Sequence, residues 1–512
     1  MEWSSLWGRE TWLDVQTWGI FVMVFVVVTA VMRARKSHSK LPHGPSLWSI
    51  SQNLTVQALK YPQFGIMKLA KKYGNIFTCY MIHIPMVALN GFQMIQEALV
   101  HQGSNFAGRP QFDIFSKGQG IINAPYGKSW KQQRRFLMTI LRNFGLGKNA
   151  FEEKILEEVR YLIEIFRSTD GRPFNPDIEI TNAVSNVICS IVFGERFHYT
   201  DPNFIQMTEL FDKSLKFQAG IWFQVAMALP FLSSFPGPHQ KMFRVQAEIE
   251  AIIQDFIKKH RESLDLQKPR DFIDAYLLEM KKEQESPNSC LTEGNLVYNV
   301  FDLFVAGTET TATTLRWAIL YMMTYPDIQE KCQKEIEQVV GWCRLPCMDD
   351  RVKMPYVSAV IHEIQRFGNV VPFTPAHAAI QDTSFRSYTM KKDTIMLVNL
   401  TSALFDEAAW KDPNNFNPAN FQNEDGEFVK PEAFIPFSLG LRACPGERVA
   451  NMELFLFFIS LLQSFTFLWP PHAPPPDLRG LYRITLAPRP YTLAVKCRNR
   501  QPARELGPSV SQ

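Results

Sequence analysis

The spacing of apolar and polar residues along the chain predicts a mainly helical protein. Apolar positions recur at intervals near 3.6 residues over most of the sequence, as on one face of a helix. Residues 76–90 are the exception, because β-branched and aromatic residues dominate there and are interrupted near Pro85, which predicts two strands and a turn. There is no internal repeat or low-complexity block. The pattern therefore predicts a mainly α fold with a small β-rich lobe.

An uncharged apolar stretch near the N-terminus predicts a membrane anchor. Residues 15–32 lie between Asp14 and Arg33 without a charged side chain, a length at the short end for a spanning helix. A basic cluster follows, so the positive-inside rule places the rest of the chain in the cytosol. A cleaved signal peptide is the alternative, but the basic segment that should precede one is missing. We predict an uncleaved anchor and basic flank over residues 1–40.

The anchor is followed by Leu41–Pro45, where prolines and a glycine predict a stiff linker. We expect His43, which is not a proline, to make this hinge slightly looser. We expect one globular domain over residues 41–498 and a polar tail over 499–512. The formal net charge of +4 is too small to indicate nucleic-acid binding. Eight scattered cysteines show no disulfide rhythm, and Cys343 and Cys347 lack the second ligand pair of a zinc site, so we expect free thiols.

Candidate chemistry is concentrated in residues 437–448. Cys444 lies in a glycine-punctuated loop just before Val449–Leu462, an amphipathic run that predicts a helix. The free N–H groups and positive dipole of a helix N-terminus favour a thiolate over a thiol, and Pro445 suits a first helical position. We expect Gly440 to turn the loop, Gly446 to let the backbone approach the sulfur, and Phe437 to shield the sulfur from water. Arg442 is expected to pair with a bound anion.

The spacing Phe-x-x-Gly-x-Arg-x-Cys-x-Gly, filled here from Phe437 to Gly446, resembles the haem-binding loop of the cytochromes P-450. The resemblance extends from about Leu41 to Lys496 and looks most like the vertebrate microsomal family-two group. It implies haem b with Cys444 as the axial iron ligand, a cysteinate that favours O–O cleavage. The competing interpretation is a buried, unreactive cysteine in a turn.

Several basic residues match positions that hold the haem propionates in this family. Trp130 and Arg134 are four residues apart on a predicted helix and share a face. The resemblance adds Arg109, His377 and Arg442. Two carboxylates that become buried must be neutralised, which these cations would do. Without a haem, each would more often be an ordinary surface residue.

A predicted helix over residues 291–324 contains Ala306-Gly307-Thr308-Glu309-Thr310-Thr311. A glycine beside hydroxyl and carboxyl groups in an apolar helix is a local conflict typical of functional sites. By resemblance this is the oxygen-activation motif, in which Thr310 and Glu309 deliver protons. A packed, threonine-rich helix is the alternative. Asp302 is expected to accept backbone N–H groups rather than to bind substrate.

Glu363 and Arg366 are three residues apart on another predicted helix and match a pair that is buried in the family. Its usual third partner, an arginine, is replaced here by Asn420. The resemblance also maps five residues to an apolar substrate pocket: Phe304, Ala306, Phe373, Tyr482 and Ile484. Such a pocket suits lipophilic substrates.

The resemblance implies a monooxygenase in the endoplasmic reticulum membrane. It would use O2 and electrons from NADPH-cytochrome P-450 reductase, with cytochrome b5 as a second candidate donor. The chain has no dinucleotide-binding fingerprint of its own. Basic residues over the cysteine side would attract an acidic donor, or form an ordinary solvated face: Lys128, Lys131, Arg135, Arg142 and Arg448. Two rivals remain, a haem-thiolate isomerase or dehydratase that needs no external electrons, and a non-enzymatic membrane haem binder.

Overall fold

The structure is a computed structural model that describes residues 41–45, 61–81, 84–110, 118–144, 149–228, 236–283 and 289–498. The predicted anchor over residues 1–40 and the tail over residues 499–512 lie outside the described residues. Among the residues that are described, no helix has the length and apolar character needed to cross a membrane.

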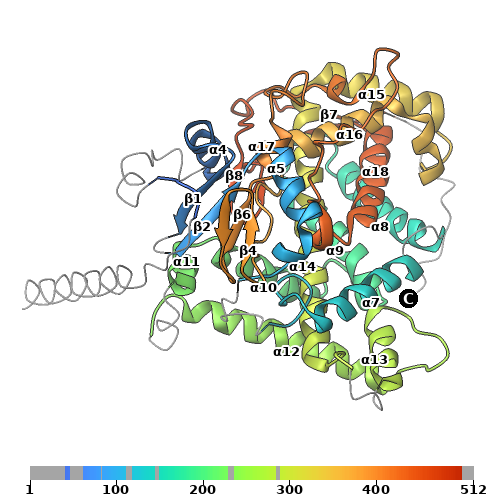
Figure 1. The fold of residues 1–512 in the computed structure, drawn as a ribbon. Helices are drawn as coiled ribbons and strands as arrows, with labels where there is room; N and C mark the ends of the chain where they lie inside the picture. The colour runs from blue at the N-terminus through green and yellow to red at the C-terminus, as the bar shows by residue number, and fades with distance from the viewer. Residues whose placement is uncertain are drawn as a thin grey trace, which may run out of the picture.

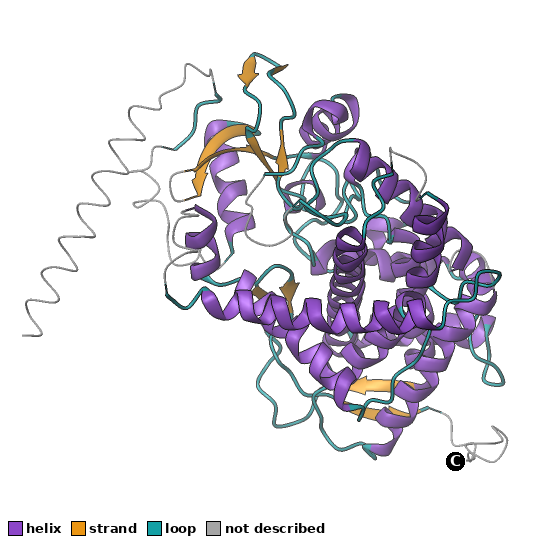
Figure 2. Cartoon of the chain, turned by 90° about the horizontal axis from the view of Figure 1, so that it is seen from below, coloured by secondary structure: helices purple, strands orange, loops and turns teal. Residues whose placement is uncertain are grey.

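Helices make up most of the described chain, and the strands are short (Figures 1 and 2). The helices are α4 (Pro62–Tyr73), α5 (Phe92–Gln96), α6 (Gly103–Phe106), α7 (Lys128–Phe144), α8 (Asn149–Ser168), α9 (Asp177–Val192), α10 (Pro202–Gln218), α11 (Ile221–Ala228), α12 (Gln240–Glu262), α13 (Phe272–Lys282), α14 (Glu293–Thr324), α15 (Pro326–Val339), α16 (Pro355–Gly368), α17 (Thr401–Leu404) and α18 (Glu447–Ser464). The strands are β1 (Ile76–Met81), β2 (Ile84–Leu89), β3 (His377–Ala378), β4 (Thr383–Phe385), β5 (Tyr388–Met390), β6 (Ile395–Val398), β7 (Phe465–Leu468), β8 (Leu481–Tyr482), β9 (Leu486–Ala487) and β10 (Ala494–Cys497). The predicted fold class is confirmed.

The β-rich lobe is built on a four-stranded sheet in the order β1-β2-β6-β3. Strands β1 and β2 form the antiparallel pair expected over residues 76–90, and β6 joins β2 in parallel. Pro85 was expected to mark the turn, but it lies inside β2 opposite Tyr80. A proline fits there because β6 pairs with β2 only over Met86–Leu89, so at Pro85 the strand has a neighbour on one side only. Figure 2 shows this lobe set apart at the upper left.

Helix α14 runs through the middle of the helical part and packs against α9, α12, α16 and α18. It begins at Glu293, two residues later than predicted, because the Thr292 side chain caps it by accepting from the backbone N–H of Asn295. The helix is continuous through Gly307. A β-carbon at Gly307 would lie 2.5 Å from Ile188 Cδ1, so the glycine lets α9 approach closely.

The linker over residues 41–45 is packed rather than loose. Pro42 and Pro45 are buried. A β-carbon at Gly44 would lie 1.9 Å from the carbonyl oxygen of Thr78 in β1, which leaves no space for another residue. The expectation of a slightly loosened hinge at His43 is therefore wrong, because the segment is held against the sheet.

Glu363 and Arg366 form an ion pair in the core, and both side chains are completely buried. Two bonds of 2.7 Å join the guanidinium to the two carboxylate oxygens. Arg366 also donates to the carbonyls of Leu404, Pro413 and Asn415, which fastens α16 to the segment before the Cys444 loop. Asn420 occupies the third position and donates to Glu363 at 3.2 Å. The amide thus keeps the contact without adding a charge.

Removing the charge of Glu363 should destabilise the fold strongly. Glu363→Gln would leave a buried guanidinium without its counterion, which typically costs about 3–5 kcal/mol of unfolding free energy. Urea unfolding of the variant and the parent protein measures this loss. The matched control is Glu330→Gln, which breaks an exposed ion pair with Lys334 and should leave the urea midpoint unchanged. Equal midpoints for the two variants would contradict the buried-pair account.

Candidate active site

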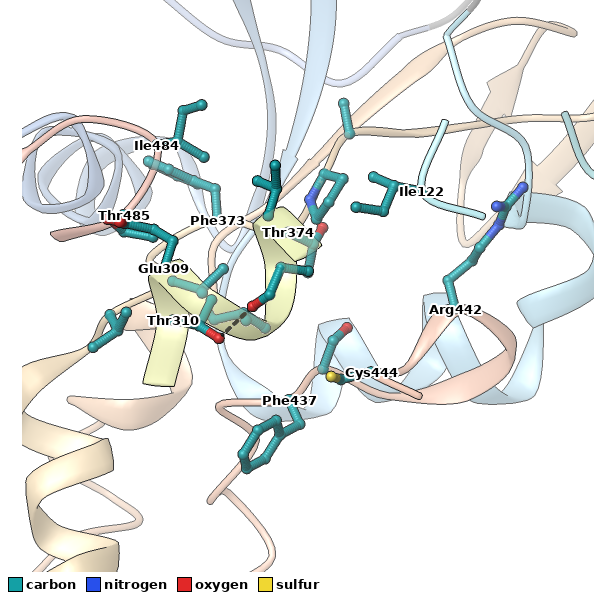
Figure 3. A pocket seen from close by; sticks show the side chains of 18 of the residues that line it. Ile122, Glu309, Thr310, Phe373, Thr374, Phe437, Arg442, Cys444, Ile484 and Thr485 are labelled. Carbon is teal, nitrogen blue, oxygen red and sulfur yellow. Dashed lines mark hydrogen bonds between the residues drawn. The ribbon is translucent and has the colours of Figure 1, made fainter. Parts of the chain in front are cut away.

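A cavity of about 1380 Å³ lies between α14, α18 and the β-rich lobe. This exceeds the range of about 300–1,000 Å³ that is usual for one small ligand. Its walls bring together residues from distant parts of the sequence, with Cys444 and Phe437 on one side and Glu309 and Thr310 across from them (Figure 3). The volume leaves space for a large planar cofactor and a substrate together.

The Cys444 loop is set by two local features. Its backbone N–H donates to the carbonyl of Phe437 at 3.0 Å, which closes the turn. Gly440 has a φ of +73°, and a β-carbon there would lie 1.8 Å from the Leu99 carbonyl oxygen, so only glycine fits. Gly440 therefore shapes the loop but does not line the cavity. Helix α18 begins at Glu447, so Pro445 precedes the first helical position and Gly446 caps the helix.

Cys444 lies deep in the protein but lines the cavity, through which its side chain is exposed. Burial raises the pKa of the Cys444 thiol, whereas the N–H groups of Gly446 and Glu447 lower it. The N–H groups of the helix end favour the thiolate, as the sequence predicted, but burial has the larger effect on the pKa. A bound metal ion would reverse the balance, because coordination removes the proton from a thiol.

Three arginines converge at one end of this cavity: Arg109, Arg134 and Arg442. Burial, together with repulsion from Arg109 and Arg134, lowers the pKa of Arg442 to about 8. Burial and Arg134 likewise lower the pKa of Arg109 to about 10, against the attraction of Asp302. Among the described residues, no ion pair joins Arg134 or Arg442 to a carboxylate. The cluster therefore favours a ligand that carries negative charge.

Backbone carbonyls hold these arginines in position. Arg442 donates to the carbonyls of Ala107, Ile121 and Ala124, and Arg134 donates to that of Ala443. Carbonyl groups satisfy the N–H donors but do not neutralise the charge. The cluster is thus oriented before any anion binds.

Trp130 and His377 are the other two residues that the sequence assigned to this group. The Trp130 ring lies under the Arg442 guanidinium at 4.1 Å, and its indole N–H donates to the Ile121 carbonyl. Trp130 is not among the cavity-lining residues, so it supports Arg442 from behind. His377 does line the cavity, and burial and Arg109 lower its pKa to about 3, which makes it a neutral neighbour.

Glu309 and Thr310 lie on α14 across the cavity from Cys444 (Figure 3). The Thr310 hydroxyl donates to the Ala306 carbonyl at 2.7 Å, as expected for a threonine that bonds back within its helix. Glu309 accepts from the hydroxyl of Thr485 at 2.7 Å. A hydroxyl and a carboxylate thus border the same space as the sulfur.

Four of the five predicted pocket residues line the cavity: Ala306, Phe373, Tyr482 and Ile484. Phe304 does not, and its assignment to the pocket is wrong. It is 1% exposed and stacks on Phe211 of α10 at 4.4 Å between ring centroids. On a helix, residues 304 and 308 share a face, and that face of α14 points into the core.

Asp302 lines the cavity and accepts the backbone N–H groups of Ile121 and Ile122 at 2.8 and 2.9 Å. The expected capping role is confirmed. Burial raises the pKa of Asp302 to about 6, although the two N–H groups oppose this.

Comparison with known proteins identifies the family. A sequence profile described as Cytochrome P450 matches residues 42–495. The chain belongs to the cytochrome P450 family. Cytochrome P450 2J2 of Homo sapiens is 42% identical over 475 residues, which cover 92% of this chain and 94% of that protein. Cytochrome P450 2B4 of Oryctolagus cuniculus is 44% identical over 447 residues, covering 86% and 90%. Cytochrome P450 2D10 of Mus musculus is 40% identical over 489 residues, covering 94% and 97%.

The residues that line the cavity fit the haem cofactor of the cytochrome P450 family. Cytochromes P450 are haem-thiolate monooxygenases, in which a cysteine ligates the haem iron. Here the Cys444 sulfur faces a cavity large enough for a porphyrin, and Arg134 and Arg442, which form no ion pair with a described carboxylate, flank it. Two propionates would supply the missing negative charge. The predicted family, cofactor and enzyme class are confirmed.

Two polar residues of this cytochrome P450 site were not found from the sequence. Thr485 bonds to Glu309 across 176 residues of sequence, and no local pattern indicates such a contact. Glu453 lies on α18, is 1% exposed and lines the cavity. Burial raises its pKa to about 8, with a smaller opposing contribution from the Thr311 hydroxyl. A single carboxylate in the apolar run Glu453–Ile459 was the available signal.

Glu453 should make the stability of this cytochrome P450 depend on pH. The folded protein keeps the Glu453 proton up to about pH 8, whereas the unfolded chain loses it near the ordinary pKa of 4.5. The unfolded state therefore binds fewer protons in this window, so stability falls as pH rises from about 4.5 to about 8. Glu453→Gln removes that term, at most about 1.4 kcal/mol per pH unit.

Unfolding midpoints measured at several pH values for both proteins test this prediction. The stability of Glu453→Gln relative to the parent should increase steadily between pH 5 and pH 8. A difference that is independent of pH would contradict the account.

Proposed function

We propose that this cytochrome P450 hydroxylates or epoxidises small lipophilic substrates such as xenobiotics, fatty acids or steroids. It takes electrons from NADPH-cytochrome P-450 reductase, with cytochrome b5 as a second donor. The observation that carries the proposal is the cavity itself. The Cys444 sulfur, a cationic cluster and a Glu309-Thr310 pair border a single space.

The residues of the proposed site have three roles, namely holding the iron, holding the haem carboxylates and delivering protons. Cys444 holds the iron, with Phe437 beside the sulfur to limit water and Gly446 leaving its approach open. Arg442, Arg134 and Arg109 hold the haem carboxylates, with Trp130 and His377 supporting that end. When bound, the haem supplies the activation of O2.

Glu309 and Thr310 form the proton-delivering group. The Thr310 hydroxyl is anchored to the Ala306 carbonyl, which orients its oxygen toward the cavity. A carboxylate next to it on α14 can take a proton from water and pass it on. Both groups are therefore suited to move protons at the face opposite Cys444.

The substrate part of the cavity is mainly apolar. Ala306, Phe373, Tyr482 and Ile484 line it, and Phe373 meets Tyr482 edge to face at 6.3 Å between ring centroids. Apolar walls with few polar anchors favour lipophilic molecules.

An exposed basic surface supports the proposal of an acidic electron donor. We define the basic face as Lys128, Lys131, Arg135, Arg142 and Arg448, all of which are exposed. Within the described part of the chain, none of them forms an ion pair. The face lies on α7 and the start of α18, next to the Cys444 loop, which Arg134 contacts directly. Positive potential there would speed the encounter with an acidic protein.

We further propose that the enzyme works at the endoplasmic reticulum membrane, held by the anchor over residues 1–40 with its catalytic domain in the cytosol. The support is the apolar stretch and the basic flank of the sequence. The two rival functions differ in what they need. An isomerase or dehydratase turns over without reductase, and a passive haem binder has no use for Thr310.

Replacing Thr310 tests the monooxygenase proposal against both rivals. In a reconstituted system with NADPH and reductase, Thr310→Ala should keep its haem but form at least tenfold less product per NADPH consumed, because a proton donor at the reacting face is lost. Thr310→Ser keeps a hydroxyl and should retain most of the coupling. Product formed equally well without reductase, or by Thr310→Ala, would sink the proposal.

A further inference from the structure

The turn between β8 and β9 makes two kinds of contact at the same cavity. On one side, Tyr482 and Ile484 line the space proposed for substrate. On the other, Thr485 is 4% exposed and points at α14, where its hydroxyl donates to Glu309 Oε1 at 2.7 Å. In Figure 3, Ile484 points away from Glu309, whereas Thr485 lies beside Glu309. Adjacent residues of one turn therefore contact the substrate space and the acidic residue.

The turn is rigidly held, so its hydroxyl is a fixed donor. The Trp317 indole N–H of α14 donates to the Leu486 carbonyl at 2.8 Å, and the Leu486 N–H donates to the Val370 carbonyl at 2.8 Å. Within the turn, the Arg483 N–H donates to the Thr485 carbonyl at 2.8 Å. These bonds fix Thr485 relative to α14 on both sides.

A second hydroxyl bonds to the same oxygen of Glu309. Thr313 donates to Oε1 at 3.3 Å, and Arg316 donates to the Thr313 hydroxyl oxygen at 2.6 Å. Arg316 is in turn paired with Asp177 at the start of α9. Because Arg316 occupies the Thr313 oxygen as a donor, the Thr313 proton is directed at Glu309.

The two bonds leave the carboxylate with distinct oxygens. Oε1 accepts from both threonines, whereas no described residue donates to Oε2. A proton taken up from water therefore goes to Oε2, the oxygen left open. A carboxylate held in this way keeps one orientation and has one free oxygen that can take up and release a proton.

We propose that Thr485 is a positioning residue for Glu309, so that the β8–β9 turn links the substrate wall to the proton-delivering carboxylate. This rests on the proposed function, in which Glu309 moves protons. Thr485 also borders the cavity, but its hydroxyl is bonded to Glu309, so we assign it a role that acts through the orientation of that carboxylate. Because Ile484 and Thr485 are adjacent in this turn, the wall of the substrate space and the support of Glu309 belong to one rigid segment.

Thr485→Val tests this role, because valine keeps the shape of threonine and lacks the hydroxyl. The matched control is Thr485→Ser, which keeps the donor. We expect Thr485→Val to lower product formed per NADPH about threefold to tenfold, as for the net loss of one typical hydrogen bond. Thr485→Ser should stay within twofold of the parent protein. The dissociation constant of a lipophilic ligand, measured by the shift of the haem absorption band, should stay within twofold for both.

A double-mutant cycle separates positioning from general structural damage. If Thr485 acts through Glu309, Thr485→Val should cause no further loss of coupling in a Glu309→Gln background. A crystal structure of Thr485→Val provides a readout independent of turnover and should show the Glu309 carboxylate moved from its present orientation.

Three results would overturn the inference while leaving the proposed function intact. They are additive losses in the double mutant, equal losses for valine and serine, and an unmoved Glu309 carboxylate in the Thr485→Val crystal structure. Absence of any reductase-dependent turnover by the parent protein would instead overturn the proposed function, and this inference with it.

Discussion

Buried positive charge constrains the centre of this protein more than any other feature. Arg109, Arg134 and Arg442 converge on a cavity whose walls are otherwise mostly apolar, and burial together with repulsion from the other two arginines lowers the pKa of Arg442 to about 8. Backbone carbonyls orient the guanidinium groups but leave their charge in place. A ligand with two carboxylates relieves this repulsion, and a metal ion at its centre would turn the Cys444 thiol into a thiolate. Cofactor and apoprotein are therefore complementary in charge at both ends of the site.

The scaffold serves this arrangement. The completely buried Glu363–Arg366 pair fastens α16 to the segments that lead into the Cys444 loop. Helix α14 crosses the molecule and carries Glu309 and Thr310 to the opposite wall, and Gly307 allows α9 to pack closely behind them. The β8–β9 turn closes the remaining side and is tied to α14 through Trp317 and Thr485. Each wall of the cavity is thus fixed by contacts outside it.

Sequence alone predicted the parts of the site that are local in the chain. The loop from Phe437 to Gly446, the Glu363–Arg366 pair and the motif around Thr310 are short patterns with a direct geometric meaning. Prediction failed where the role of a residue depended on the direction of its side chain or on a partner distant in the sequence. Phe304 was assigned to the pocket, but its position around the helix turns it into the core. Thr485 was missed because its partner is 176 residues away.

The central claim is that Cys444 binds haem iron as a thiolate in this cavity. The most direct test is the carbon monoxide difference spectrum of the dithionite-reduced, full-length protein, recorded beside Cys444→Ala. The account predicts a strongly red-shifted Soret band for the parent protein and its loss in the variant. A Soret band at the position typical of neutral ligands in correctly folded parent protein, or an unchanged spectrum for Cys444→Ala, would contradict it.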